Sequence, residues 1–248
     1  MALNNMKTAT ITFHAPNNNG SFLQAYALQK YITTHFDNVE NEIIDFQPES
    51  QQQQYAIFRK IHSKKDILRN LISFWHYKAL SKRFLAFSEM REKYLKMTKR
   101  CTTTEEALKI AGNYDLVIAG SDQIWNTTAR DFSEAFFLPG ISKKSTYAVS
   151  CGSHLNEVDC DRICSAMEAF KNVSVREIDT REFLEKHTKR SIETVLDPTF
   201  LLTKEDYSGL YDKERILKEK YIFLYTINYD EDALKQTVRV AERWGCKI

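Results

Sequence analysis

The sequence predicts an α/β protein built on a doubly wound, mostly parallel, Rossmann-like sheet. Short β-branched apolar runs alternate with longer segments of helical periodicity along most of the 248 residues. The first strand, helix and strand fit within roughly forty residues, enough for a right-handed βαβ unit. Only 7 glycines and 4 prolines are present, which excludes collagen-like and loop-rich classes. Repeated βα units build a parallel sheet that is covered by helices.

The expected elements follow the chain in order. Runs rich in β-branched or aromatic residues predict strands at 9–13, 41–46, 114–119, 145–150, 172–175, 194–196 and 221–227. Helical periodicity predicts a helix that begins at Ser21 and further helices at 103–111, 157–170, 178–187 and 231–244. Two capping boxes are expected, one from Ser21 and Gln24 and one from Thr103 and Glu106.

The chain is expected to hold two domains. Residues 1–212 form a Rossmann-like domain that carries a basic helical insertion at 47–100. Residues 213–248 contain one strand, one helix and a glycine cap, which cannot bury their apolar faces alone. This segment is therefore expected to be the beginning of a second, truncated Rossmann-like domain.

The insertion is strongly basic. Between Tyr55 and Arg100, 13 Lys and Arg stand against 3 acids; the remainder has 22 bases and 30 acids, so the two parts are near +10 and −8. Seven aromatic residues are interleaved: Phe58, Phe74, Trp75, Tyr77, Phe84, Phe87 and Tyr94. The favoured interpretation is two helices that pack these rings inward. An alternative is peripheral contact of residues 55–100 with an anionic membrane; the pattern also suits nucleic acid, but no nucleic-acid partner is expected.

The composition also indicates the cellular compartment in which the protein is expected. No apolar run approaches the ~20 residues that span a bilayer, and no secretory signal opens the chain. The 5 cysteines include no CxxC, and Cys160 and Cys164 are spaced to share one helix. Reduced thiols are favoured there over a metal or redox site. We expect a cytoplasmic protein without metal or cofactor, in peripheral contact with the inner face of the cell membrane if residues 55–100 bind lipid.

The turn after the first expected strand is the first candidate site. Backbone N–H groups at a helix start suit a phosphate or carboxylate, and asparagine amides add neutral donors. Gly20 lets a ligand approach the backbone closely. The alternative is an ordinary turn, in which the polar residues serve only as caps. The candidate binding residues are Asn17, Asn18, Asn19, Gly20, Ser21 and Gln24.

The second candidate site is the run AGSDQIWN at 119–126. Ligands of open parallel sheets bind beyond the carboxyl ends of strands, and small polar residues begin here where a strand ends. Polar side chains can hold hydroxyls, and Trp125 can stack on a sugar ring. The alternative places Trp125 in the core and uses Asp122 as a cap. The candidate residues are Gly120, Ser121, Asp122, Gln123, Trp125 and Asn126.

A third candidate site combines two later strand ends. Arg176 is expected to clamp an anion, the alternative being an ion pair with Glu177 or Asp179. Ser150 and Gly152 are expected to bind substrate.

Two further residues of this region are candidate catalytic groups. Neither a helix N-terminus nor a paired base is evident beside Cys151, so a thiol nucleophile is not favoured. His154 is interpreted either as a base or as a solvent-facing turn residue.

Six blocks in this order resemble the polysaccharide pyruvyl transferase family: TFHAPNNNGSFLQAYALQKY, NEIIDFQP, DLVIAGSDQIWN, STYAVSCGS, NVSVRE and VLDPTFLL. Their joint spacing is more specific than any one block. The resemblance implies a GT-B-like fold, in which two Rossmann-like domains face each other across a cleft. It also implies transfer of a pyruvyl group from phosphoenolpyruvate to a sugar of a cell-surface polysaccharide, as a ketal, with release of phosphate.

The resemblance carries expectations about partners and roles. The acceptor is expected to be a sugar or a lipid-linked oligosaccharide, with Asp122 or His14 as general acid or base. The family's Arg and His that are best linked to phosphoenolpyruvate belong to the C-terminal domain, and nothing here matches them, so this chain alone is expected to be inactive. Alternatives are a GT-B-type glycosyltransferase that uses a nucleotide sugar, or a non-catalytic module that binds sugar or membrane. The oligomeric state stays open.

Overall fold

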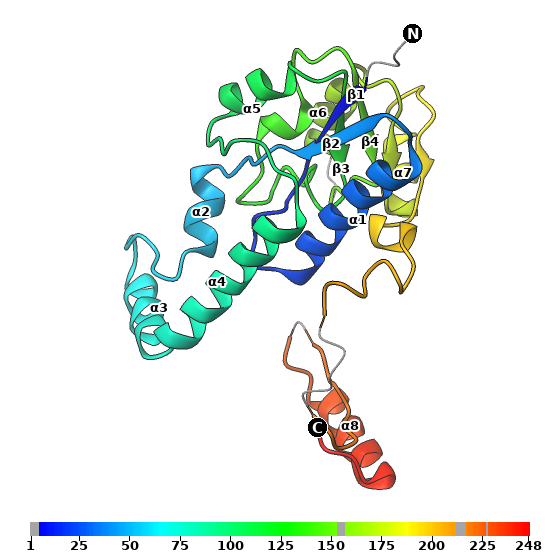
Figure 1. The fold of residues 1–248 in the computed structure, drawn as a ribbon. Coiled ribbons are helices and arrows are strands. Elements are labelled where there is room, and N and C mark those ends of the chain that lie inside the picture. Colours follow the sequence, from blue (N-terminus) through cyan, green and yellow to red (C-terminus); the bar gives the residue numbers. More distant parts are fainter. Residues whose placement is uncertain (1–4, 153–156, 212–216, 227) are drawn as a thin grey trace. The chain divides into compact units, whose positions relative to one another are not determined.

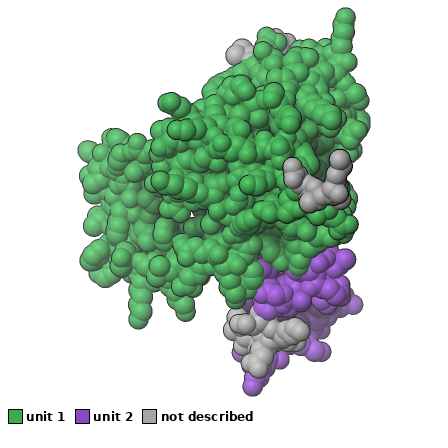
Figure 2. Space-filling view, turned by 45° about the horizontal axis from the view of Figure 1, so that its top comes forward, with its two compact units in different colours: residues 1–202 green, residues 203–248 purple. Residues whose placement is uncertain are grey.

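The computed structural model describes residues 5–152, 157–211, 217–226 and 228–248. The chain divides into two compact units, unit 1 at Met1–Leu202 and unit 2 at Thr203–Ile248 (Figure 2). The expected domain boundary after residue 212 falls outside the described residues and stays a prediction.

Unit 1 is built around a parallel sheet of four strands. Their order is β2 (Val39–Ile43), β1 (Met6–Ile11), β3 (Leu116–Gly120) and β4 (Lys144–Tyr147). The last four residues of β1 are buried in succession, on both faces of the sheet. A run that is buried on both faces is typical of a central strand in a parallel sheet, which explains its β-branched sequence.

Two short strands extend this arrangement. β5 (Ser174–Val175) and β6 (Glu193–Thr194) pair in parallel. The backbone N–H of Arg176 donates to the carbonyl of Val149 at 3.0 Å, and a parallel bridge joins Val149 to Val175, so β5 follows β4. The spatial order is therefore 2-1-3-4-5-6, which confirms the predicted α/β class with a mostly parallel, Rossmann-like sheet.

The strand order reverses between β1 and β3. From β1 the chain moves to β2 on one side and later returns on the other side with β3. Loops that leave the carboxyl ends of β1 and β3 therefore run in opposite directions and open a crevice between them. This crevice is the usual ligand site of an open parallel sheet.

Helix α1 (Asn19–His35) packs on the sheet through Phe22, Ala25, Leu28 and Ile32. The expected capping box of Ser21 and Gln24 is wrong. Asn18 is the N-cap, and its Oδ1 accepts hydrogen bonds from the N–H groups of Gly20 (2.7 Å) and Ser21 (3.4 Å). Because Asn18 satisfies these orphan donors, the side chains of Ser21 and Gln24 are free to bond across the sheet edge.

The remaining helices of the sheet region are α5 (Thr104–Ala111), α6 (Glu157–Met167) and α7 (Ile178–Leu184) (Figure 1). The capping box of Thr103 and Glu106 at the start of α5 is confirmed. Cys160 and Cys164 share α6 as predicted, with their sulfurs 3.7 Å apart. A continuous apolar cluster fills the interior, and its largest side chain, Trp125, is completely buried.

The insertion contains three helices, α2 (Glu49–Tyr55), α3 (Lys64–Trp75) and α4 (Tyr77–Tyr94). Figure 1 shows α3 and the first part of α4 extending away from the sheet. The favoured interpretation, with the rings packed inward, is wrong for most of them: Trp75 is 83% exposed and Phe74 69%. Few core contacts are available this far from the sheet, so only Phe87 is buried. No helix in the described part of the chain is both long enough and apolar enough to serve as a membrane span.

Unit 2 contains helix α8 (Glu231–Trp244), which begins at Asp230 and ends at Gly245 in the left-handed region, as predicted for a glycine cap. The expected strand at 221–227 is not formed in its described part. Tyr221 alone makes a parallel bridge, with Lys247, and the N–H of Ile222 donates to the Lys247 carbonyl at 2.8 Å. A strand needs a continuous partner for its backbone groups, and the described residues offer one bridge only.

Candidate functional site

The loops that follow β1 and β3 meet at the crevice. The hydroxyl of Thr12 donates to the carbonyl of Ser121 at 2.9 Å. The hydroxyl of Ser21, in the first turn of α1, donates to Oδ2 of Asp122 at 2.8 Å. Residues that lie 101 positions apart in sequence are thus joined. The first and second candidate sites form one site, at the place where the topology predicts a ligand.

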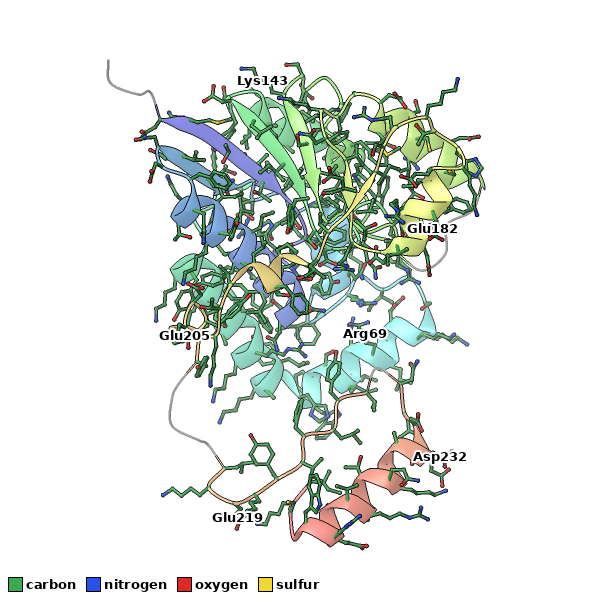
Figure 3. The ribbon with its side chains drawn as sticks, turned by 90° about the vertical axis from the view of Figure 1, so that its right-hand side faces the viewer. Arg69, Lys143, Glu182, Glu205, Glu219 and Asp232 are labelled. Carbon is green, nitrogen blue, oxygen red and sulfur yellow. The ribbon has the colours of Figure 1, made fainter. Side chains whose placement is uncertain are left out.

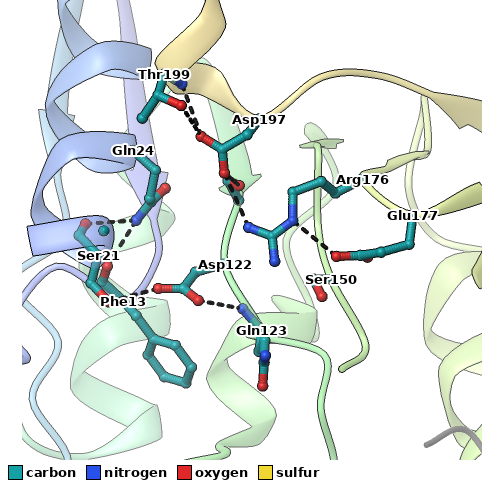
Figure 4. Close-up of polar contacts among 12 residues, drawn as sticks. Phe13, Ser21, Gln24, Asp122, Gln123, Ser150, Arg176, Glu177, Asp197 and Thr199 are labelled. Atoms are coloured by element: carbon teal, nitrogen blue, oxygen red, sulfur yellow. Dashed lines mark hydrogen bonds and ion pairs between the residues drawn. The ribbon is translucent and has the colours of Figure 1, made fainter. Parts of the chain in front are cut away.

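A pocket of about 320 Å³ lies at this edge. Figure 4 shows its polar side chains converging from α1, from the loop after β3 and from the turn after β6. Six of its nine lining residues were expected to bind substrate, and they come from all three candidate sites. The lining residues are Asn18, Gly20, Ser21, Gln24, Asp122, Arg176, Asp197, Thr199 and Phe200.

Asp122 is held in an uncommon backbone conformation at the mouth of the crevice. Its φ is +69°, in the left-handed region that few residues other than glycine, asparagine and aspartate adopt. Its Oδ1 accepts from the N–H of Gln123 at 2.8 Å, while its Oδ2 accepts from Ser21. A carboxylate that is fixed at both oxygens and half-buried has the geometry of a positioned proton acceptor.

Gln24 provides an unsatisfied acceptor beside this carboxylate. Its Nε2 donates to Oγ1 of Thr12 (3.0 Å) and to the carbonyls of Phe13 (2.8 Å) and Ser21 (2.9 Å). Its Oε1 is buried and has no partner among the described residues. A buried acceptor without a donor is costly, so a ligand that brings a hydroxyl donor into the pocket would be stabilised there.

Arg176 lies in the pocket as expected, but its charge is already matched. Its Nε donates to Oε1 of Glu177 at 2.9 Å, and its Nη1 donates to Oδ2 of Asp197 at 3.0 Å. Burial alone would lower the pKa of Arg176, but these two carboxylates raise it, so the guanidinium stays charged. With two carboxylates on one guanidinium, the expected anion clamp does not fit; the alternative, an ion pair with Glu177, is confirmed.

Asp197 and Thr199 were missed by the sequence predictions. The 3₁₀ turn Pro198–Leu201 follows β6, and Asp197 caps it by accepting from the N–H (2.9 Å) and hydroxyl (2.7 Å) of Thr199. The hydroxyl of Ser121 also donates to Asp197 at 3.3 Å. Both residues belong to the block VLDPTFLL of the family resemblance, but locally they show only an Asp-Pro pair at a strand end, which is typical of any turn.

The asparagine loop is held in place by the insertion. Two arginines of α4 reach back to it: Arg83 donates to the carbonyl of Asn17 at 2.9 Å, and Arg91 donates to the carbonyl of Ala15 at 3.0 Å. Arg91 is buried, and its burial lowers its pKa. The loop itself exposes Asn18, Asn19 and Gly20. Part of the basic charge of the insertion therefore positions one wall of the site.

The expected acid or base role of His14 is contradicted by its burial. His14 is 1% exposed, and its two ring nitrogens lie 2.9 Å from Oδ1 of Asp45 and 3.2 Å from the carbonyl of Thr12. Burial would raise the pKa of Asp45, but the hydrogen bond and charge of His14, together with Gln47 and Arg100, lower it to about 2. His14 therefore belongs to a buried polar network that ties β1 to the chain after β2.

Trp125 is also not a sugar platform. It is completely buried, its Nε1 donates to the carbonyl of Phe136 at 3.3 Å, and its ring contacts those of Phe137 and Phe170. The alternative interpretation, a core residue, is confirmed. A ring with no exposed face cannot stack on a ligand.

Gly120 serves packing, not ligand approach. A Cβ at this position would lie 2.8 Å from Leu28 and 2.9 Å from Thr10, so α1 approaches β3 only because no side chain is present. Gly152 has φ +76°, and a Cβ there would lie 2.6 Å from Asn126. Both glycines are therefore explained by the fold alone.

The other predicted residues lie around the pocket but do not line it. Ser150 is buried and its Oγ accepts from the N–H of Gly152 at 3.2 Å. Gln123 is exposed, and its Oε1 accepts from Asn126 at 3.2 Å. Cys151 is buried, and burial raises its pKa far above the ordinary range, so the environment disfavours a thiolate nucleophile. His154 lies outside the described residues.

The described residues hold no group of three or more His, Cys, Asp or Glu side chains that could bind a metal ion. The chemistry of the pocket rests on the fixed carboxylate of Asp122, one orphan amide oxygen, hydroxyls, and an arginine that is paired with Asp197 and Glu177. Such a lining is suited to a polyhydroxylated ligand: it can accept hydroxyl protons and orient hydroxyl oxygens.

No curated protein and no solved structure matches the chain. A family model described as polysaccharide pyruvyl transferase matches residues 18–245, a range that begins at the cap of α1 and includes every residue that lines the pocket. The chain therefore belongs to the polysaccharide pyruvyl transferase family.

Proposed function

We propose that the protein transfers a pyruvyl group from phosphoenolpyruvate to a sugar of a cell-surface polysaccharide, as a ketal. The family membership supports the reaction class. The observation that carries the proposal is the strand-end pocket, where the fixed carboxylate of Asp122 and the orphan Oε1 of Gln24 line one cavity. Both groups accept hydrogen bonds, which is what a sugar with free hydroxyls needs.

The reaction consumes two hydroxyls of one sugar. One hydroxyl oxygen adds to C2 of phosphoenolpyruvate while C3 takes up a proton and becomes a methyl group. The second hydroxyl oxygen then displaces phosphate from C2, which closes the ketal. Of the two hydroxyl protons, one balances the proton gained by C3 and the other leaves with phosphate.

Asp122 is proposed as the base for the acceptor hydroxyl. Its two hydrogen bonds, from Ser21 and from the N–H of Gln123, fix the carboxylate without neutralising it. Positioned proton transfer of this kind contributes about 10²–10⁴ in rate. Because Asp197 and Glu177 match the charge of Arg176, the pocket suits the sugar better than the anionic donor.

The test is release of phosphate from phosphoenolpyruvate by the protein, with a panel of saccharides as acceptors. Asp122→Asn keeps the left-handed backbone and the hydrogen bond to Ser21 but removes the base, so kcat should fall by about 10²–10⁴. Asp37→Asn, an exposed change after α1, is the matched control and should keep full activity. Release of nucleotide from a nucleotide sugar, without phosphate release, would instead establish the glycosyltransferase alternative. An Asp122→Asn enzyme with full activity would remove Asp122 from the mechanism.

A location in the cytoplasm, with peripheral contact at the inner face of the membrane through residues 55–100, is proposed as well. The observation behind it is the exposure of Trp75, Phe74 and Leu68 on a strongly basic insertion. The protein should sediment with vesicles that contain anionic lipid, and Lys78→Glu with Lys82→Glu should abolish this. Absence of binding by the unchanged protein would dismiss membrane contact. Binding of sugar or vesicles without any release of phosphate would instead support the alternative of a non-catalytic module.

A further inference from the structure

A second pocket, of about 420 Å³, lies at the base of the insertion. Three arginines line it, and each comes from a different segment: Arg59 from the loop between α2 and α3, Arg69 from α3 and Arg83 from α4. Figure 3 shows Arg69 on the inserted helices. Asn18 lines both this pocket and the candidate site, so the two pockets adjoin at the asparagine loop.

The charge of this pocket is not matched from within. Among the described residues, no carboxylate oxygen lies within 4.0 Å of a guanidinium nitrogen of Arg59, Arg69 or Arg83. Asp66 accepts from the hydroxyl of Ser63 and from the N–H of His62, at the start of α3. The candidate site differs, because its single arginine is matched by two carboxylates.

Arg59 is also incompletely bonded. Its Nη2 donates to the carbonyl of Gln54 at 2.6 Å, but its Nε is buried and has no acceptor in the part of the chain that the structure describes. Burial, followed by the charges of Arg69 and Arg130, lowers the pKa of Arg59, and the smaller opposing effect of Asp66 does not offset this. A buried donor without an acceptor, next to like charges, is stabilised most by an anion with several oxygens.

We propose that this pocket binds a phosphate or diphosphate group. Guanidinium groups match phosphate oxygens in geometry as well as charge, and three of them from three segments can surround one such group. Phe84 and Leu80 line the same pocket and give it an apolar side, which accommodates the organic part of a phosphate ester. The group comes either from a soluble phosphorylated ligand or from a lipid headgroup, and the chemistry of the pocket is the same for both.

The first arm of the test uses a soluble probe. Titration calorimetry of the whole chain with inorganic pyrophosphate should give saturable binding. Arg69→Gln should weaken it by about tenfold or more, since a charge-assisted hydrogen bond is lost. Lys143→Gln removes an equal charge at the far end of the sheet region, as Figure 3 shows, and should leave the affinity unchanged. Arg83 is avoided because it also holds the asparagine loop.

The second arm uses vesicles that contain phosphatidic acid, whose headgroup is a phosphate monoester. Pyrophosphate binding that Arg69→Gln and Arg59→Gln weaken supports a soluble ligand. Vesicle binding that the same changes weaken, without a response to pyrophosphate, supports a lipid headgroup. Binding of neither probe overturns the site, and so does an affinity that Lys143→Gln lowers as much as Arg69→Gln does.

Discussion

The core of the sheet region buries large aromatic rings, whereas the end of the insertion exposes them. Trp125, Phe136 and Phe170 are at most 2% exposed, while Phe74 and Trp75 at the end of α3 are 69% and 83% exposed. The two sets are equally hydrophobic by residue type. The difference shows that aromatic residues in the core of the sheet region stabilise the fold by packing, whereas those at the end of the insertion form an exposed apolar surface.

The two pockets also differ, in whether their arginines are paired with carboxylates. The strand-end pocket contains an arginine matched by Glu177 and Asp197, while the pocket of the insertion contains arginines that no described carboxylate pairs. An arginine that is paired with carboxylates fixes the position of its neighbours, whereas unpaired arginines attract an anionic ligand. The first pocket is therefore interpreted as a sugar site and the second as an anion site.

The largest expected effect comes from the core ring. Trp125→Ala removes a completely buried side chain and its contacts with Phe137 and Phe170, so the free energy of unfolding should fall by about 3–5 kcal/mol. Urea denaturation measures it. Trp75→Ala, on the exposed end of α3, is the matched control and should change stability by less than about 0.5 kcal/mol. Equal losses in both variants would mean that the insertion is packed like the core.

A smaller loss is expected at the contact between α1 and β3. In Gly120→Ala the new Cβ would meet Leu28 at 2.8 Å and Thr10 at 2.9 Å, so about 1–3 kcal/mol of unfolding free energy should be lost. Gly112→Ala, where the nearest atom lies 3.6 Å away and φ is −63°, should cause no loss. If Gly120→Ala were as stable as the unchanged protein, packing would not explain this glycine, and close approach of a ligand would again be the favoured explanation.

The buried network of Asp45 predicts a pH dependence. The pKa of Asp45 is about 2 in the folded chain against 3.8 for the free side chain, so its carboxylate favours the folded state above about pH 4. This contribution, about 2 kcal/mol, is lost as the pH falls from 4 towards 2.

Urea unfolding across this pH range measures the effect. Asp45→Asn should be less stable at neutral pH and should lose less stability on acidification than the unchanged protein. The exposed change Asp37→Asn should keep the original pH profile. An unchanged slope in Asp45→Asn would show that the network with His14 and Arg100 does not hold the carboxylate.

The smallest effect is expected at the exposed end of the insertion. Phe74→Ser with Trp75→Ser should change the unfolding free energy by less than about 0.5 kcal/mol, because both rings already face solvent. Retention on a hydrophobic column should nevertheless decrease. A stability loss of more than about 1 kcal/mol would show that these rings pack against the body of the protein.

Much of the fold could be predicted because periodicity and capping are local properties. The order of strands and helices, the capping box of Thr103 and Glu106, and the shared helix of Cys160 and Cys164 all follow from residues within a few positions of each other. The candidate loops were also predictable in part, since in an open parallel sheet ligands bind beyond the carboxyl ends of strands.

The sequence by itself therefore determined the α/β class, the family and the edge of the sheet where the candidate site lies. Only the tertiary structure decided which residues at that edge are accessible. Ser21 meets Asp122, and Ser121 meets Asp197, across 101 and 76 positions of sequence, while His14 and Trp125 turn into the interior. Burial and pairing depend on neighbours that are distant along the chain, so no local pattern distinguishes a sugar-binding tryptophan from a core one.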